Sequence, residues 1–330
     1  MKPIQLKKPA LKPDRLYLFS FLVPVLVMLV IFVIQEIYPF GERSFLHIDM
    51  YHQYFPFLVE FYHKLKNGES LFYSWNTGIG SNFLALYVYY LASPANWLCV
   101  LVPEQFLMEF LSYLVVVKIG LCGLSFTYYI RKHFHSESWV ILCFSLFYAL
   151  SGFMAAYNWD VMWLDVIVLA PVIILGVERL VFEGKCYMYC ISLGLSILSN
   201  YYLSIMLCIF LVLYFAVLLI AREPSTAQDS APLAFPKLGG IRNFYGKAVI
   251  RFGVFSLLAG GMAAVLLLPE LAALRFTEFS DINFPSKIKT YFPVIDMIAR
   301  HCFNVTVETG LDHWPNLYCG VPVFVLLPLY

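Results

Sequence analysis

Long apolar runs, each about as long as one crossing of a membrane, alternate with short polar segments along this chain. A helix rises about 1.5 Å per residue, so about 20 apolar residues span a hydrocarbon core of about 30 Å. Four runs of this kind lie at residues 16–35, 106–130, 139–157 and 163–182. The pattern therefore predicts an all-α, polytopic integral membrane protein.

The stretch 186–221 is longer than one crossing and carries no charged residue. As a single straight helix it would be about 54 Å long, well beyond the thickness of a bilayer core. Ser199 and Asn200, followed by two tyrosines, lie near its middle and are polar enough to form a turn. We expect two short helices joined by this turn on the outer side of the membrane.

A seventh apolar run covers residues 252–268, and an eighth begins near 317 with only about 14 residues left, fewer than a crossing needs. We expect one transmembrane domain over residues 1–330, with about seven complete spans and part of an eighth, truncated at its C-terminus. The large loops are expected at about 40–105 and 269–316 on the outside and at about 222–251 in the cytoplasm.

The positions of Lys and Arg set the expected orientation, because cytoplasmic loops are enriched in these residues. Several precede the first span: Lys2, Lys7, Lys8, Lys12 and Arg15. Others follow the second span or lie in the 222–251 loop. The N-terminus is therefore expected in the cytoplasm, with the 40–105 and 269–316 loops outside.

Composition supports the membrane assignment and excludes some classes of function. The chain is 61% hydrophobic, 18% aromatic and only 13% charged, with a formal net charge of +1. Its cationic residues form no basic face, so we expect no nucleic-acid partner. The eight cysteines include no CxxC pair, and they are best interpreted as small buried hydrophobic residues.

The best candidate for chemistry is the beginning of the first outer loop. Asp49 lies between His47 and His52, just beyond the first span, and Gln53 follows. A carboxylate here could act as a general base, or it could cap a helix over 50–65. The two histidines could hold a divalent metal ion together with Asp49. Their spacing is not diagnostic of a metal site, however, and exposed histidines bonded to water are more common.

Two further carboxylates lie at the second outer turn. Asp160 is in the turn itself, where a solvated side chain explains it equally well. Asp165 is at the outer end of the fourth span, where a negative charge also suits a helix N-terminus. Because ionisable residues within a membrane tend to mark functional sites, we choose Asp165 as the second catalytic carboxylate.

Three cations are candidates for binding a phosphate group. Lys118 lies near the centre of the second span, where an unpaired cation costs about 3 kcal/mol or more. It could pair with Glu178 or Asp165, or it could attract a lipid phosphate from within a hydrated cavity. Arg275 and Arg300 lie in the second outer loop, and a guanidinium group matches phosphate oxygens well.

Several separated motifs, in the same order, resemble the YfhO-type family of bacterial membrane proteins. They are DMYHQY at 49–54, YSWNTGIGSN at 73–82, YYLASPAN at 89–96, WLD at 163–165, SNYY at 199–202 and NLYCG at 316–320. The resemblance covers nearly the whole chain, although members of that family are considerably longer.

This resemblance implies a GT-C-like helical bundle with large extracytoplasmic loops, in the bacterial cell membrane. It implies a glycosyltransferase that moves a sugar from a polyprenyl-phosphate carrier to a cell-envelope polymer such as lipoteichoic acid. Asp49 and Asp165 would be catalytic. The expected substrate-binding residues are His52, Gln53, Trp75, Asn76, Lys118, Asn200, Arg275 and Arg300. A divalent metal ion, held by Asp49, His47 and His52, remains open.

A transporter or lipid flippase is the main alternative. It would use Lys118, Asp165 and Glu178 as a buried charge relay through the spans. The polar residues gather in the outer loops rather than along several spans, which favours the transferase. A non-catalytic envelope scaffold is a third interpretation that the sequence leaves open.

Overall fold

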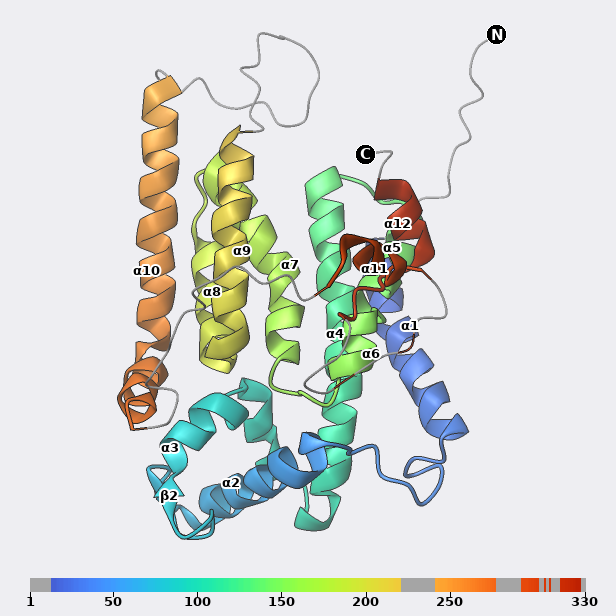
Figure 1. Ribbon diagram of the computed structural model, residues 1–330, viewed down its shortest axis with the longest axis vertical. Coiled ribbons are helices and arrows are strands. Elements are labelled where there is room, and N and C mark those ends of the chain that lie inside the picture. The colour runs from blue at the N-terminus through green and yellow to red at the C-terminus, as the bar shows by residue number, and fades with distance from the viewer. Residues whose placement is uncertain are drawn as a thin grey trace. The chain divides into compact units, whose positions relative to one another are not determined.

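The computed structural model describes residues 13–220, 241–276, 292–302, 306, 309 and 315–327, and these residues form an almost entirely helical protein (Figure 1). The longest helices are α1 (Pro13–Ile34), α4 (Leu107–Phe134), α7 (Leu164–Phe182), α9 (Tyr201–Ile220) and α10 (Ile241–Leu274). The shorter ones are η1 (Met50–Tyr54), α2 (Phe55–Asn67), α3 (Phe83–Leu86), η2 (Tyr87–Leu91), η3 (Pro94–Leu101), η4 (Glu104–Phe106), α5 (Val140–Ala149), α6 (Gly152–Tyr157), α8 (Tyr187–Ser199), α11 (Val294–Ala299) and α12 (Val321–Leu326). The prediction of an all-α fold is confirmed.

Five segments within the described residues are long and apolar enough to cross a membrane. They are Arg15–Ile34, Glu104–Phe134, Val140–Tyr157, Tyr201–Ile220 and Phe244–Leu274. These segments confirm the prediction of a multi-pass membrane protein.

Three other helical segments bear on the number of crossings. α7 lies where the fourth span was expected but carries three charged residues, and α8 has only 13 residues. Phe83–Leu91 and Pro94–Leu101, inside the expected first outer loop, together form an apolar pair bent by 102°. This pair is either a broken span or a re-entrant loop, so the count of seven complete spans stays a prediction.

The α8–α9 junction agrees with the turn expected in the middle of 186–221. α8 ends at Ser199, Asn200 is extended with φ −159° and ψ 107°, and α9 begins at Tyr201. The Asn200 side chain accepts a hydrogen bond from the backbone N–H of Leu203 at 2.9 Å and so caps α9. The expectation of two helices rather than one is confirmed.

Two of the expected loops differ from the structure at their edges. α10 begins at Ile241, so part of the expected 222–251 loop is helical, and 221–240 lies outside the described residues. α10 also runs on to Leu274, through Pro269. Lys and Arg favour helices and extend their charged ends away from apolar surroundings. A helix can therefore continue past the apolar run on which the prediction was based.

The chain divides into two compact units. The first comprises Met1–Arg43, Val116–Asn158 and Thr290–Tyr330. Within it, the buried hydroxyl of Thr127 on α4 bonds to Ser20 on α1 at 2.6 Å and to Ser145 on α5 at 2.5 Å. Hydroxyl pairs of this kind satisfy polar groups between membrane helices.

The second unit comprises Ser44–Val115 and Trp159–Lys289, and it contains α2, α3 and α7 to α10. α8 packs against α7, α9 and α10, and the four helices lie side by side (Figure 1). Their core includes Ile173, Val177, Leu180, Tyr189 and Phe215. η2 contacts α8 and α10, and α3 contacts α10, so the first outer loop packs against this helix group.

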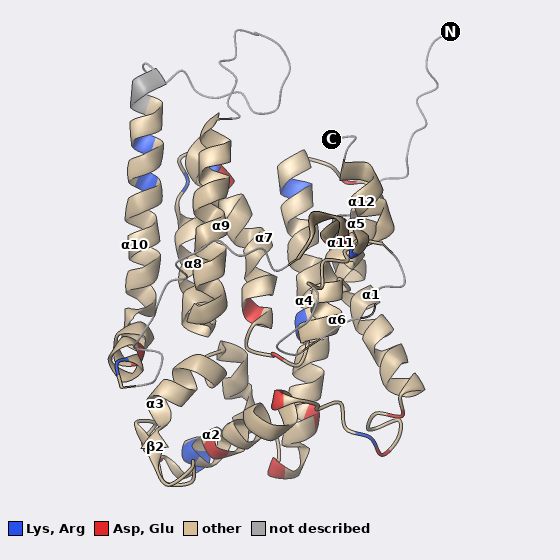
Figure 2. Cartoon of the chain, in the orientation of Figure 1, with Lys and Arg blue, Asp and Glu red and all other residues tan. Residues whose placement is uncertain are grey.

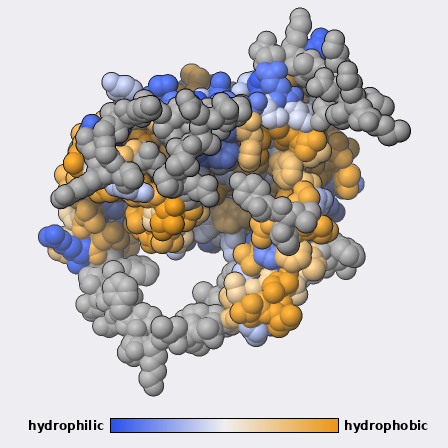
Figure 3. All heavy atoms as spheres, turned by 90° about the horizontal axis from the view of Figure 1, so that it is seen from above, coloured by the Kyte–Doolittle hydropathy of each residue, from blue (hydrophilic) through white to orange (hydrophobic). Residues whose placement is uncertain are grey.

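The second unit also shows surfaces suited to lipid. α8 and α9 carry no charged residue, whereas Lys247 and Arg251 lie toward one end of α10 (Figure 2). Ile209 and Leu213 on α9 are 60% and 63% exposed. Hydrophobic side chains, in orange, cover wide areas of the described surface seen in Figure 3. Exposed apolar surface of this extent is typical of contact with a bilayer.

Candidate functional site

A buried carboxylate–tyrosine pair is the centre of the candidate site. Tyr54 is the last residue of η1, and α2 follows directly, with Pro56 in its first turn. Asp160 lies in the turn between α6 and α7. The Tyr54 hydroxyl donates a hydrogen bond to Oδ1 of Asp160 at 2.5 Å. Asp160 is only 2% exposed, and its Oδ2 atom is buried without a hydrogen-bond partner among the described residues. One oxygen of this carboxylate is therefore held, and the other has no hydrogen-bond donor among the described residues.

The surroundings of Asp160 change its acidity. Burial raises the pKa of Asp160 to about 7, the hydrogen bond from Tyr54 opposes that rise, and the negative charge of Asp49 adds to it. Burial also raises the pKa of the Tyr54 hydroxyl, and the Asp160 charge raises it further. Asp160 thus gains or loses a proton near neutral pH, which is the property that a general acid or base needs.

Asp49 lies beside this pair and is half-buried. It precedes η1, but its side chain makes no capping hydrogen bond to that helix. The alternative explanation of Asp49 as a helix cap therefore has no hydrogen bond to support it. The charge of Asp49 acts on both Tyr54 and Asp160, so the structure brings it close to the buried carboxylate.

Aromatic rings surround the pair. The Tyr54 ring lies 5.4 Å from that of Tyr90 and stacks on Trp159 at 6.4 Å. The Tyr90 hydroxyl donates to Oε1 of Gln53 at 3.5 Å. Gln53, one of the expected substrate-binding residues, is thereby placed beside Tyr90 and next to Tyr54 in the chain. Aromatic faces with adjacent amides and carboxylates suit the recognition of sugars.

Asn200 lies close to the same cluster, where its side chain has a structural role. It is fully buried, and its amide nitrogen donates to the Tyr89 carbonyl at 3.3 Å. Because its oxygen also caps α9, the side chain joins η2 to the α8–α9 turn. Its contribution to a substrate site would be to position the neighbouring tyrosines.

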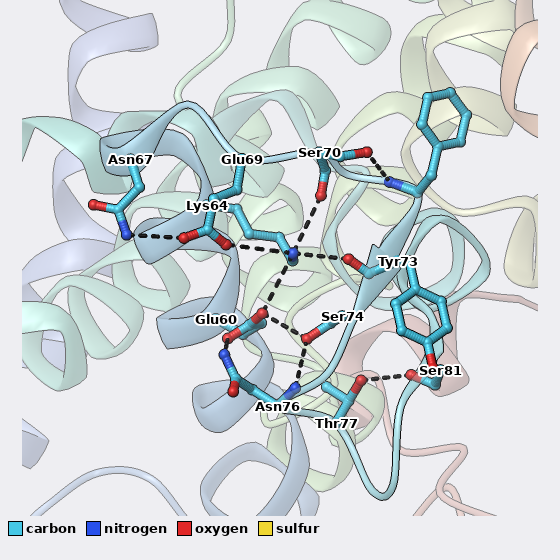
Figure 4. Close-up of polar contacts among 11 residues, drawn as sticks. Glu60, Lys64, Asn67, Glu69, Ser70, Tyr73, Ser74, Asn76, Thr77 and Ser81 are labelled. Atoms are coloured by element: carbon cyan, nitrogen blue, oxygen red, sulfur yellow. Dashed lines mark hydrogen bonds and ion pairs between the residues drawn. The ribbon is translucent and has the colours of Figure 1, made fainter.

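A second polar network holds the hairpin of the first outer loop (Figure 4). Glu60 on α2 accepts hydrogen bonds from Ser74 at 2.6 Å and from the Asn76 amide at 3.0 Å. Lys64, one turn later, lies 3.5 Å from Glu60 and donates to the carbonyls of Ser70 and Tyr73. Burial works against ionisation of Glu60, but these hydrogen bonds and the Lys64 charge lower its pKa.

This network fixes strands β1 (Tyr73–Ser74) and β2 (Ser81–Asn82), which pair antiparallel. Trp75 follows β1, is 78% exposed, and contacts the Tyr73 ring edge-on at 4.9 Å. Asn76 is tied to Glu60, so its amide supports the hairpin. Of these two expected substrate-binding residues, Trp75 is the one that faces outward.

The histidines are exposed. His47 bonds to the backbone carbonyl of Phe45 at 2.9 Å, and His52 contacts the Tyr51 ring edge-on. No group of three or more His, Cys, Asp or Glu side chains in the described part of the chain is arranged to hold a metal ion. The structure thus does not bring His47, His52 and Asp49 together as a set of ligands.

The remaining candidates lie elsewhere in the chain. Lys118 on α4 is 2% exposed, and Asp165 is half-buried in the first turn of α7. Arg275 is exposed beyond the end of α10. Arg300 donates to the carbonyls of Pro315 and Thr306 and to the side chain of Asn316. That arrangement gives Arg300 a structural role within its own loop.

Three buried residues that are prominent in the structure, Glu60, Lys64 and Glu270, were not predicted from the sequence. Glu60 and Lys64 are four residues apart in an amphipathic helix, a spacing that signals an ion pair. Glu270 follows Pro269 near the end of a long apolar helix, where a carboxylate is unusual. Both signals were present in the sequence, but neither shows which distant residue completes the contact.

The described residues thus form an all-α, multi-pass membrane protein with a buried carboxylate–tyrosine pair, in which Tyr54 ends η1 and Asp160 lies in the turn between α6 and α7. The family described as Bacterial membrane protein YfhO matches residues 20–330, and the chain belongs to this family. The resemblance inferred from the motifs is confirmed. No curated protein and no solved structure matches the chain.

Proposed function

We propose that this chain is part of a membrane glycosyltransferase, which moves a sugar from a polyprenyl-phosphate carrier to a cell-envelope polymer such as lipoteichoic acid. The reaction takes place on the outer face of a bacterial cell membrane, with the N-terminus in the cytoplasm. Membership of the YfhO family supports this class of function. The observation that carries the proposal is the pair of neighbouring carboxylates, Asp49 and Asp160, set among aromatic side chains.

Asp49 is the proposed general base. It removes the proton from the acceptor hydroxyl while the acceptor oxygen forms a bond to the anomeric carbon. The bond from that carbon to the phosphate oxygen breaks, and the polyprenyl phosphate leaves with the electron pair. The structure favours Asp160 over Asp165 as the second carboxylate, because Asp160 is buried beside Asp49 and titrates near neutral pH.

The departing phosphate needs positive charge nearby. Arg275 is the proposed source, since the guanidinium of Arg300 is already bonded to its own loop. Gln53 and Trp75 are the proposed contacts to the sugars, one beside Tyr90 and one on the exposed hairpin.

The test uses the full native protein in membranes with radiolabelled polyprenyl-phosphate sugars. Transfer of label from the lipid to polymer is the expected result, and loss of transfer in Asp49→Asn would assign the base. Glu104→Gln is a suitable control, because Glu104 is exposed in the same loop and pairs with His63 at 2.9 Å. Label that stays on the lipid in all conditions would contradict the proposal.

A lipid flippase is the second candidate, and one observation favours it. Lys118 and Glu178 are 2% and 7% exposed within long apolar helices, as a buried charge relay requires. Glu178 also accepts a hydrogen bond from Tyr214 on α9 at 2.6 Å. A flippase would move labelled lipid between the leaflets of proteoliposomes without releasing its sugar, which the same preparation can measure.

A further inference from the structure

A second buried carboxylate, on α10, lies close to the tyrosines around Asp160. Glu270 is 5% exposed, and its Oε1 atom accepts a hydrogen bond from the Tyr201 hydroxyl at 2.8 Å. Its Oε2 atom is buried and has no hydrogen-bond partner among the described residues. A buried acceptor left unsatisfied is destabilising, and more so when it is charged, so such a group calls for an explanation.

Glu270 and Asp160 share the same arrangement. Each is nearly fully buried, accepts one hydrogen bond from a tyrosine hydroxyl, and leaves its second oxygen without a partner in the described structure. They come from different elements, one from α10 and one from the turn before α7. Each leaves one oxygen for an outside donor.

The tyrosines connect these two carboxylates. Tyr54, which holds Asp160, contacts Tyr90 at 5.4 Å between ring centroids, and Tyr90 contacts Tyr89 at 4.7 Å. The Tyr89 ring then meets Tyr201, which holds Glu270, at 5.9 Å. The charges of Asp160 and Glu270 both act on the Tyr89 hydroxyl, so both acids lie near this ring.

The positions of these rings are fixed by backbone features. Asn200 bonds to the Tyr89 carbonyl and caps the helix that begins with Tyr201, so η2 and α9 are held together at this point. α10, which carries Glu270, contacts both α3 and η2. Tyr89 and Tyr201 are therefore held in place before any ligand arrives, which lowers the cost of binding.

We infer that Asp160 and Glu270 are the two ends of one saccharide-binding site, lined by Tyr54, Tyr89, Tyr90 and Tyr201. The free carboxylate oxygens accept hydrogen bonds from ligand hydroxyls, and the rings pack against the apolar faces of the sugar. This inference rests on the proposed transferase function, and it assigns to Glu270 the role of binding and orienting a sugar. The ligand is either the sugar of the lipid donor or a hydroxyl-bearing unit of the polymer.

Glu270→Gln tests the inference with little change of shape. The glutamine oxygen still accepts from Tyr201, but an NH2 group replaces the free Oε2 acceptor and cannot bond to a hydroxyl hydrogen. Loss of a hydrogen bond to a charged group corresponds to about a ten- to hundredfold loss of affinity. Tyr201→Phe, which frees Glu270 from its partner, should weaken binding by a smaller factor.

Glu104→Gln is the control. Glu104 is an exposed carboxylate that pairs with His63 at 2.9 Å, and neither of its oxygens is among the described buried atoms without a partner. We expect the affinity for sugars to be unchanged in this variant. The melting temperatures of all the variants report whether each protein is folded.

Binding is measured on the native protein in proteoliposomes with three probes: a polyprenyl-phosphate sugar, polyprenyl phosphate without sugar, and purified lipoteichoic acid. Weaker binding of the first probe alone in Glu270→Gln identifies the donor sugar, and weaker binding of the polymer alone identifies the acceptor. Unchanged binding of both by folded Glu270→Gln and Tyr201→Phe overturns the inference, even where the wild-type protein transfers sugar. A wild-type protein that neither transfers sugar nor prefers the sugar-bearing lipid overturns the proposed function as well.

Discussion

At the scale of single residues, the site depends on carboxylates whose environments differ. Asp160 is buried against Tyr54, whereas Asp49 is half-buried and makes no capping bond. Two neighbouring acids in different environments can take different roles in one reaction, one giving and one accepting protons. This division could not be predicted from sequence, because Tyr54 and Asp160 are 106 residues apart.

The raised pKa of Asp160 predicts how stability depends on pH. Its folded-state pKa is about 7 against an ordinary value of 3.8, so between these values the native protein keeps a proton that the unfolded chain has lost. Stability from this group is therefore full below about pH 4 and falls as the pH rises to 7, by on the order of 4 kcal/mol. Melting temperatures in detergent should show this slope in the wild type and a flatter profile in Asp160→Asn.

Asp49→Asn tests whether the charge of Asp49 contributes to the raised pKa of Asp160. Removing the negative charge of Asp49 should lower the pKa of Asp160, because that charge helps to raise it. The fluorescence of Trp159, which stacks on Tyr54, can follow the titration. A titration midpoint that does not move in Asp49→Asn would show that the two acids are not coupled.

Asp49 is also predicted to matter for turnover rather than folding. Loss of a general base typically reduces a rate by on the order of 10² to 10⁴. Since the side chain makes no capping bond, Asp49→Ala should express as well as Asp49→Asn, and both should lose transfer. Normal transfer by a well-expressed Asp49→Asn would exclude Asp49 as the base and leave Asp160 and Asp165 to be tested.

At the scale of elements, the sequence predicted individual helices and turns better than it predicted the contacts between them. The α8–α9 turn followed from the length of an uncharged run and from Ser199 and Asn200, which are polar residues within it. From the sequence, the hairpin at 73–82 was recognised only as a family motif that contains the expected substrate-binding residues Trp75 and Asn76. Lys64, on the preceding helix, holds this hairpin by donating hydrogen bonds to its backbone. This role could not be predicted without knowing where the chain folds back onto that helix.

Lys64→Met is predicted to loosen this hairpin. The substitution leaves Glu60 buried without its cation, and breaking a buried ion pair in this way costs about 3–5 kcal/mol. We expect faster proteolysis within residues 68–82 and weaker binding of any substrate that touches Trp75. Lys66→Ala is the control, because Lys66 is exposed and lies over the Tyr62 ring at 5.5 Å. Equal proteolysis of the two variants would show that Lys64 does not hold the hairpin.

At the scale of the whole molecule, the membrane character was predictable because about 20 apolar residues in a row have few other uses. Five candidate spans stand out among the described residues, at α1, α4, α5–α6, α9 and α10. The bent Phe83–Leu101 segment was harder to predict, since a sharp bend interrupts its apolar character. Such interruptions are common where a membrane protein binds its substrate.

The orientation of the spans is the last prediction, and the proposed reaction depends on it. If the N-terminus is cytoplasmic, the first outer loop faces outward, where the carrier presents its sugar. Ile79, at the hairpin, is 98% exposed and uncharged, so Ile79→Cys should react with a membrane-impermeant thiol reagent in intact cells. Ser230→Cys, in the predicted cytoplasmic loop, should react only after permeabilisation. The unsubstituted protein gives the background, because exposed cysteines such as Cys143 are already present. The reverse labelling pattern would place Asp49 and Asp160 in the cytoplasm, and the donor would then have to be a sugar that is available there.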